Sequence, residues 1–309
     1  MQIEFFHSIE QFKNIVKLVR DRSNFSNTQL PTLKFTGTVK LHGTNAGLTN
    51  IGGNATAISR TRVLNANDDN FGFFAQQIGQ YEKDWQEYLD NIGENVTVFG
   101  EWCGKGIQKG VGISNLERMF IIFSCKIGDL WIPVPHSPKI PNVFVITEFQ
   151  TYEITIDFSC PEQATNILGE ITQSVENECP VALKLGSTGV GEGVVWTCDS
   201  DPSLVFKVKG KKHSSTKVKT LAAVDVERIS SLKDLVGYVL SNNRMEQIYN
   251  EMILESESFQ NKNIGVFIQK CVHDCIKEES DTIAASGFSI KDFTKIAPHI
   301  AKNWIFGRI

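Results

Sequence analysis

The stretch FTGTVKLHGTNAGLT, residues 35–49, places a lysine among β-forming residues and follows it with His-Gly-Thr-Asn. Lysine is depleted in strand interiors, so Lys40 is unusual at this position. Gly43 permits close backbone approach to a ligand just beyond a strand. A nucleophilic lysine fits this setting, and its amine must lose a proton before it can attack. From this stretch alone, however, a surface lysine before a turn is the simpler interpretation.

The composition bounds the class of protein. The chain has 309 residues, of which 41% are hydrophobic, and a formal net charge of −4, which argues against a histone-like polycation. The first residues lack the pattern of a secretory signal, and no stretch approaches the roughly 18 apolar residues of a membrane span. We expect a soluble, cytoplasmic monomer that does not bind membranes. Seven scattered cysteines give neither a disulfide framework nor a zinc ribbon, and Cys271, His273 and Cys275 make only a weak metal motif.

Periodicity divides the chain into a sheet-rich part and a helical part. Ser8 and Gln11 form a capping-box pattern that predicts a first helix over residues 8–20. Short β-branched runs follow, interrupted by predicted helices at 70–92 and 161–178. Four helical patterns occupy the chain after residue 220. The sequence therefore predicts an α+β domain over residues 1–220 and a small all-helical C-terminal domain over residues 221–309.

Further candidate residues lie beside glycine-rich turns and on a strand. Residues 99–112, FGEWCGKGIQKGVG, place Glu101 at the end of a β-run, and GEGVVW places Glu192 at the start of another. In VFKVKGKK, the period of two puts Lys207 and Lys209 on one face of a strand. Neither glycine run is a Walker A or G-x-G-x-x-G motif, which makes a P-loop or Rossmann site improbable.

Six motifs in this order resemble the covalent nucleotidyltransferase motifs of ATP-dependent RNA ligases: K-x-H-G-x-N, S-R-T-R, F-G-E-x-x-G-x-G-I-Q-K, M-F-I-I-F, E-G-V-V and F-K-V-K. The first motif and G-I-Q-K most resemble the RNA ligase 2 family, the phage type that seals nicks in double-stranded RNA. The resemblance spans about residues 35–210. It implies an adenylation (nucleotidyltransferase) domain of antiparallel β-sheets flanked by helices, and the helical tail suits the same family.

The resemblance assigns roles to nine residues. Catalysis would fall to Lys40 as the site of AMP attachment, to Glu192 as the metal ligand, and to Lys207 and Lys209, which would grip the phosphates. The nucleotide-binding residues would be these four together with His42, Asn45, Arg60, Glu101 at the ribose and Phe123 stacked on adenine. Three positions depart from the family pattern: Val39 replaces a frequent Glu, Arg62 a Gly and Ser124 an Asp. These departures affect the expected adenine and RNA contacts rather than the core chemistry.

The expected reaction joins RNA 3′-hydroxyl and 5′-phosphate ends, with a nicked duplex as the expected partner, ATP as substrate and Mg²⁺ or Mn²⁺ as the metal. RNA repair is the expected role. The segment 207–219 holds six lysines and fits either phosphate contacts or a solvated linker. Three alternatives stay open: a DNA ligase, an RNA capping enzyme, and a catalytically idle RNA-binding protein with the same fold.

Overall fold

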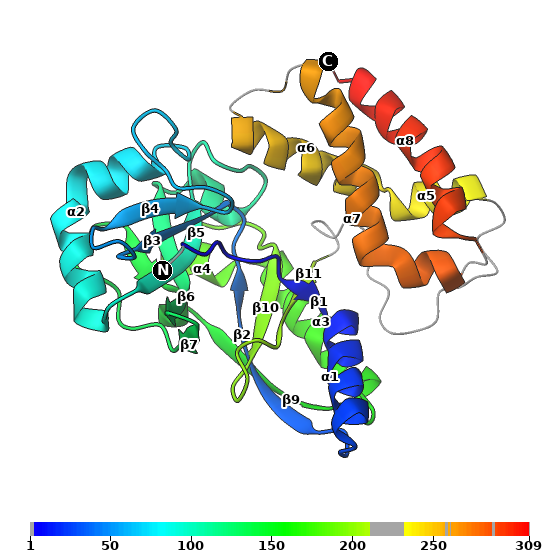
Figure 1. The fold of residues 1–309 in the computed structure, drawn as a ribbon, viewed down its shortest axis with the longest axis horizontal. Helices are drawn as coiled ribbons and strands as arrows, with labels where there is room; N and C mark the ends of the chain where they lie inside the picture. The colour runs from blue at the N-terminus through cyan, green and yellow to red at the C-terminus, as the bar shows by residue number, and fades with distance from the viewer. Residues whose placement is uncertain (1–2, 211–231, 257–258, 260, 286–287, 309) are drawn as a thin grey trace. The chain divides into compact units, whose positions relative to one another are not determined.

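A computed structural model describes residues 3–210, 232–256, 259, 261–285 and 288–308 (Figure 1). The chain divides into two compact units, Met1–Gly210 and Lys211–Ile309. The predicted domain boundary at residue 220 lies outside the described residues, and so does most of the lysine-rich segment, from residue 211 onward. Each unit is therefore described by itself.

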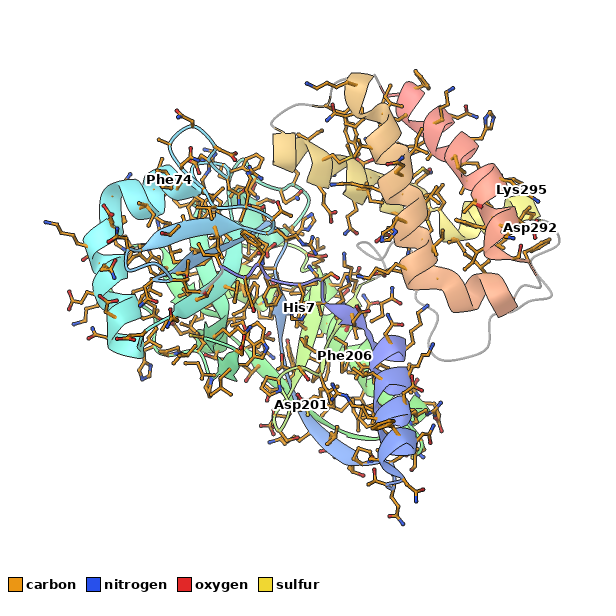
Figure 2. All side chains as sticks on the ribbon, in the orientation of Figure 1. His7, Phe74, Asp201, Phe206, Asp292 and Lys295 are labelled. Carbon is orange, nitrogen blue, oxygen red and sulfur yellow. The ribbon has the colours of Figure 1, made fainter. Side chains whose placement is uncertain are left out.

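The first sheet of the N-terminal unit has five strands in the order β1-β11-β10-β2-β9. Their bounds are β1 Glu10–Gln11, β2 Thr32–Lys40, β9 Thr151–Asp157, β10 Gly193–Cys198 and β11 Val205–Lys209. All neighbours are antiparallel except β1 and β11, which are parallel. Two helices, α1 (Phe12–Ser26) and α3 (Glu162–Asn177), pack against this sheet. The ring of Phe12 on α1 lies 4.9 Å from that of Phe206 on β11, which is labelled in Figure 2.

The second sheet has the order β4-β3-β5-β6-β7, and β8 adds to β6 in parallel. The strands are β3 Thr44–Thr49, β4 Thr56–Ser59, β5 Val96–Cys103, β6 Met119–Ile127, β7 Leu130–Ile132 and β8 Val143–Val145. Helix α2 (Phe73–Ile92) lies along this sheet (Figure 1). Its buried Trp85 meets Phe120 of β6 at a centroid distance of 6.0 Å. The short helix α4 spans Pro180–Lys184.

The C-terminal unit is helical throughout its described residues. It contains α5 (Leu232–Val239), α6 (Asn242–Ser256), α7 (Ile264–Ala285) and α8 (Ile290–Phe306). Ser289 caps α8 by accepting a hydrogen bond from the N–H of Asp292, which Figure 2 labels beside Lys295. Cys271 and Cys275 are buried in the apolar core of this unit. In the described part of the chain, no helix is long and apolar enough to cross a membrane.

The predicted fold class is confirmed: an α+β unit of mainly antiparallel sheets flanked by helices is followed by helices. Three details of the prediction are wrong. Helix α1 begins at Phe12 rather than near Ser8, because Glu10 and Gln11 pair with β11 as a short strand. Strands β3 and β9 were missed, although the alternating burial of Ile154 and Ile156 on β9 is a readable strand pattern. The parallel pairs of β1 with β11 and β8 with β6 were also not expected.

Candidate active site

Three strands of the first sheet bring distant parts of the sequence into one row. Strand β10 lies between β2 and β11, so Gly193 is aligned with Lys40 on one side and with Lys209 on the other. Glu192 directly precedes this glycine, although 152 residues separate it from Lys40. The register of the sheet therefore gathers one carboxylate and two ammonium groups at the same end of the sheet.

Glu192 is the centre of this cluster. Its Oε2 accepts a hydrogen bond from Lys40 Nζ at 2.8 Å and lies 3.3 Å from His42 Nδ1, while its Oε1 lies 2.9 Å from Lys209 Nζ. The Glu192 side chain is 2% exposed, whereas those of Lys40, Lys209 and His42 are 20%, 13% and 25% exposed. The buried anion is thus covered by groups that reach solvent, and the solvent-facing side of the cluster is rich in positive charge.

The ionisation of Glu192 follows from these contacts. Burial alone would favour the neutral carboxyl, but the ammonium groups of Lys209 and Lys40 and the hydrogen bond from His42 outweigh it and hold the pKa of Glu192 well below its usual range. A carboxylate with such a low pKa is a weak proton acceptor. Glu192 is therefore suited to orienting the two lysines and to binding a cation rather than to removing a proton.

Gly193 has no room for a side chain. A Cβ at this position would lie 2.1 Å from the carbonyl oxygen of Val208, and the φ angle of 153° is one that L-residues rarely adopt. Any other residue would push β11 away from β10 and change the spacing between Glu192 and Lys209. Gly193 is not among the predicted site residues, although its place between Glu192 and a β-run is a visible signal.

Glu101 lies close to the same cluster but belongs to the second sheet. Its Oε1 accepts a hydrogen bond from the N–H of Gly43 at 2.9 Å, in the turn that links β2 to β3. Burial, together with repulsion from Glu192, raises the pKa of Glu101 above its ordinary value, and Lys40 and the Gly43 N–H oppose that rise only in part. The pKa values of the two carboxyl groups of the site, Glu101 and Glu192, are therefore shifted in opposite directions.

Asn45 also lies beside Glu101, because the two residues are aligned across β3 and β5. The Asn45 carbonyl oxygen accepts a hydrogen bond from Asn70 Nδ2, and Thr44 Oγ1 donates to Asn70 Oδ1. The loop that precedes α2 is thus tied to the strand that follows Lys40. The structure brings Lys40, His42, Glu101 and Glu192 together, with Asn45 next to them on β3.

Phe123 sits at a bulge of β6. Phe99 on β5 is aligned with Ser124 and Gly100 with Ile122, so Phe123 is the extra residue of the pair of strands. A bulge turns the side chain of the extra residue away from the regular alternation. The ring of Phe6 packs edge-on against Phe123 at 5.0 Å. Phe6 is not among the predicted site residues, because nothing in the local sequence around Phe6 indicates a contact with β6.

The segment that carries Phe6 crosses from one sheet to the other (Figure 1). Phe6 also contacts Phe99 and Trp131 of the second sheet, and β1 then pairs with β11 of the first. His7, labelled in Figure 2, stacks on Phe6 at 5.0 Å. This N-terminal segment therefore passes beside two predicted nucleotide-binding positions, Phe123 on β6 and Lys207 on β11.

The remaining predicted residues take different places. Lys207 and Lys209 occupy alternate positions of β11 and share one face of the strand, and Gln11 is aligned with Lys207. Arg60 follows β4 and is exposed, and it makes no ion pair within the described part of the chain. The structure does not bring Arg60 into the Glu192 cluster. Arg62, one of the departures, donates from Nε to Asp68 at 2.7 Å.

Comparison with known proteins gives one family and a group of solved structures. The RNA ligase family model matches residues 33–219. A Naegleria gruberi RNA ligase solved with pyrophosphate has a TM-score of 0.44 and 15% identity, over 68% of this chain and 56% of that one. Two variants of the same enzyme, one with ATP and Mn and one with AMP and Mn, each have a TM-score of 0.46, with the same identity and the same coverage. The chain thus spans little more than half the length of that enzyme. No curated protein matches the sequence.

Proposed function

This chain belongs to the RNA ligase family, and we propose that it joins RNA 3′-hydroxyl and 5′-phosphate ends through a lysyl-AMP intermediate. The observation that carries the proposal is the Glu192 cluster. A buried carboxylate holds Lys40 and Lys209 at 2.8 and 2.9 Å, and their ammonium groups cover it on the solvent side. Such a site favours a polyanion, because its exposed groups are cationic.

Each residue has a part in the proposed first step. The neutral amine of Lys40 attacks the α-phosphorus of ATP, the bond to the β-phosphate oxygen breaks, and pyrophosphate leaves. Lys207 and Lys209, on one face of β11, neutralise the phosphates. Glu101 holds the ribose, and Phe123 lies against the adenine. The Glu101 carboxyl can accept a hydrogen bond from a ribose hydroxyl.

Two further steps complete the proposed reaction. An oxygen of the RNA 5′-phosphate displaces Lys40 from AMP, which gives an RNA-adenylate. The 3′-hydroxyl of the neighbouring end then attacks that 5′-phosphorus, and AMP leaves as the phosphodiester forms. Dividing the condensation this way replaces one difficult step by easier ones. The substrate that the motifs favour is a nicked RNA duplex, and sealing such a nick would serve RNA repair.

A divalent ion, Mg²⁺ or Mn²⁺, is part of this proposal. Mg²⁺ is usually held by one or two carboxylates together with substrate phosphates, rather than by a cage of protein ligands. The described residues contain no group of three His, Cys, Asp or Glu side chains arranged for a metal, and Glu192 with Glu101 nearby fits that sparser mode. Glu192 would be the carboxylate ligand. The ion would neutralise charge on the triphosphate.

The test is transfer of nucleotide to the protein. The chain is incubated with α-labelled ATP or GTP and a divalent metal and is then resolved by denaturing electrophoresis. Label from ATP alone supports a ligase, label from GTP a capping enzyme, and no label an idle RNA-binding protein. Joining assays on matched nicked RNA duplex, nicked DNA duplex and single-stranded RNA then separate an RNA ligase from a DNA ligase and identify the substrate.

A further inference from the structure

A pocket lined mainly by polar residues lies in the N-terminal unit, and its lining residues are separate from the Glu192 cluster. It has a volume of about 420 Å³, within the range of small-ligand sites, and is lined by Gln76, Lys105, Gly106, Glu117, Arg118 and Asn142. These residues come from α2, from the glycine-rich loop after β5, and from the approaches to β6 and β8. Two cations face one carboxylate, so the pocket carries a net positive charge.

Arg118 is held in place before any ligand arrives. Its Nη1 donates to the carbonyl oxygen of Phe71 at 2.8 Å, and its Nε donates to that of Lys105 at 3.1 Å. Two loops thus fix the guanidinium, while its Nη2 has no hydrogen-bond partner among the described residues. The ammonium of Lys105 and the amides of Gln76 and Asn142 are likewise unbonded to any described residue. The pocket therefore presents one prepositioned guanidinium together with several uncommitted donors, an arrangement that suits a phosphate group.

Hydrogen bonds link the loops around this pocket to the elements of the candidate active site. The Phe71 carbonyl that anchors Arg118 also accepts from Trp102 Nε1, next to Glu101 on β5. In the loop that carries Lys105, Gln108 Nε2 lies 3.5 Å from the carbonyl oxygen of Gly43, in the turn after Lys40. Lys105 and Gln108 are three positions apart in this loop, so their Cα atoms are at most roughly 10–11 Å apart. The loop that lines the pocket with Lys105 therefore also contacts the turn after Lys40.

We propose that the Lys105–Arg118 pocket binds a backbone phosphate of the RNA substrate close to the end that reacts. The inference rests on the proposed ligase function and adds a contact to it. Lys105 supplies a point charge, Arg118 a prepositioned donor, and Glu117 opposes both. Because a phosphate contact carries no sequence information, the pocket should contribute affinity and position rather than base preference.

The experiment measures binding of the full-length chain to a nicked RNA duplex by fluorescence anisotropy over a series of salt concentrations, without ATP. Lys105→Glu should weaken binding about tenfold and Lys105→Ala about threefold, and the slope of log K against log salt should fall by about one. Lys105→Arg should restore parental binding. Removing the opposing charge with Glu117→Gln should tighten binding about twofold. Matched controls are Lys83→Glu and Glu82→Gln, whose exposed side chains lie on α2.

The outcomes separate this proposal from the one on which it rests. If Lys105→Glu binds RNA no more weakly than Lys83→Glu, or if the parent binds no RNA, the phosphate subsite is wrong. A rise in the KM for ATP in Lys-AMP formation, with RNA affinity unchanged, would also overturn it and would make the pocket a nucleotide contact. Failure of the parent to form Lys-AMP, by contrast, would remove the ligase proposal. Melting temperatures verify that each variant is folded.

Discussion

Two clusters of buried charge, one in each unit, are built in opposite ways. In the N-terminal unit the carboxylate of Glu192 is buried, and the lysines around it reach solvent. In the C-terminal unit the guanidinium of Arg244 is 1% exposed, and its Nη atoms lie 3.4 Å from Asp274 and 3.5 Å from Glu279. The first cluster thus presents cations to solvent, whereas the second buries its cation beside two carboxylates, of which Asp274 is 40% exposed.

The difference separates a binding site from a structural ion pair. An incoming phosphate can replace solvent around Lys40 and Lys209 without leaving Glu192 uncompensated, because the ammonium groups stay beside it. Around Arg244 an added anion would have to enter a packed core between α6 and α7. Both clusters perturb ionisation, so a shifted pKa alone does not identify a functional site. Exposure of the cationic groups is what distinguishes the two clusters, because Lys40 and Lys209 reach solvent whereas Arg244 is 1% exposed.

The largest effect should come from the nucleophile itself. Lys40→Ala removes the nitrogen that forms the bond to AMP, and we expect no detectable Lys-AMP with α-labelled ATP. Lys34→Ala is the matched control, because Lys34 is also on β2 but is half exposed and pairs with Glu153 at 3.0 Å. It should keep parental activity. Labelling of the Lys40→Ala protein at the parental level would contradict the assignment of AMP attachment to the Glu192 cluster.

The next effect compares the two clusters directly. Glu192→Gln should slow Lys-AMP formation by about 10²-fold, the usual cost of removing one preorganised electrostatic partner from an active site. Glu279→Gln makes the same chemical change beside Arg244, and it should leave the rate within a factor of about two. Single-turnover labelling at saturating ATP measures both. Equal losses in the two variants would mean that general destabilisation, not chemistry, explains the Glu192 result.

A third effect concerns stability rather than chemistry. Arg244→Leu removes the buried cation beside Glu279 and should lower the free energy of unfolding of the helical unit by about 2–4 kcal/mol. Urea unfolding followed by circular dichroism at the helical band measures the change. Lys-AMP formation by the folded variant should match that of the parent. A variant as stable as the parent, or one with impaired labelling, would contradict the structural assignment of this cluster.

The smallest effect is a difference in pH dependence between the two site carboxylates. The folded-state pKa of Glu192 lies below its unfolded value of roughly 4.3. The stability that ionised Glu192 contributes to the folded protein is therefore complete above that value and is lost as the pH falls through the folded pKa. The pKa of Glu101 is raised, so its charged form costs stability increasingly as the pH rises above roughly 4.3.

The free energy of unfolding of Glu192→Gln should therefore be closest to that of the parent in acid. That of Glu101→Gln should rise relative to the parent as the pH rises toward neutrality. Each pKa unit of difference corresponds to about 1.4 kcal/mol. Urea unfolding of the parent and both variants at several pH values between about 3 and 7 measures the two trends. Trends of the same sign for the two variants would show that the carboxylates are not perturbed in opposite directions.

Much of the architecture was readable from local pattern. The stripe of apolar residues that includes Trp85 and Leu89 predicted α2, and the helical periods after residue 220 predicted α5 to α8, because an amphipathic helix reports its own buried face. The start of α1 was not readable. The local capping pattern at Ser8 lost to the pairing of Glu10 and Gln11 with β11, a partner almost 200 residues away.

The sequence by itself determined the order of the motifs, the helices of the second unit and the presence of Lys40, Glu101, Glu192, Lys207 and Lys209. Only the tertiary structure decided that Glu192 lies between Lys40 and Lys209, that Phe6 packs on Phe123, and that Arg60 stands apart from the cluster. The physical reason is the range of the interactions. Helix periodicity and turn chemistry act within a few residues, whereas the register of β10 between β2 and β11 depends on hydrogen bonds between segments far apart in the chain.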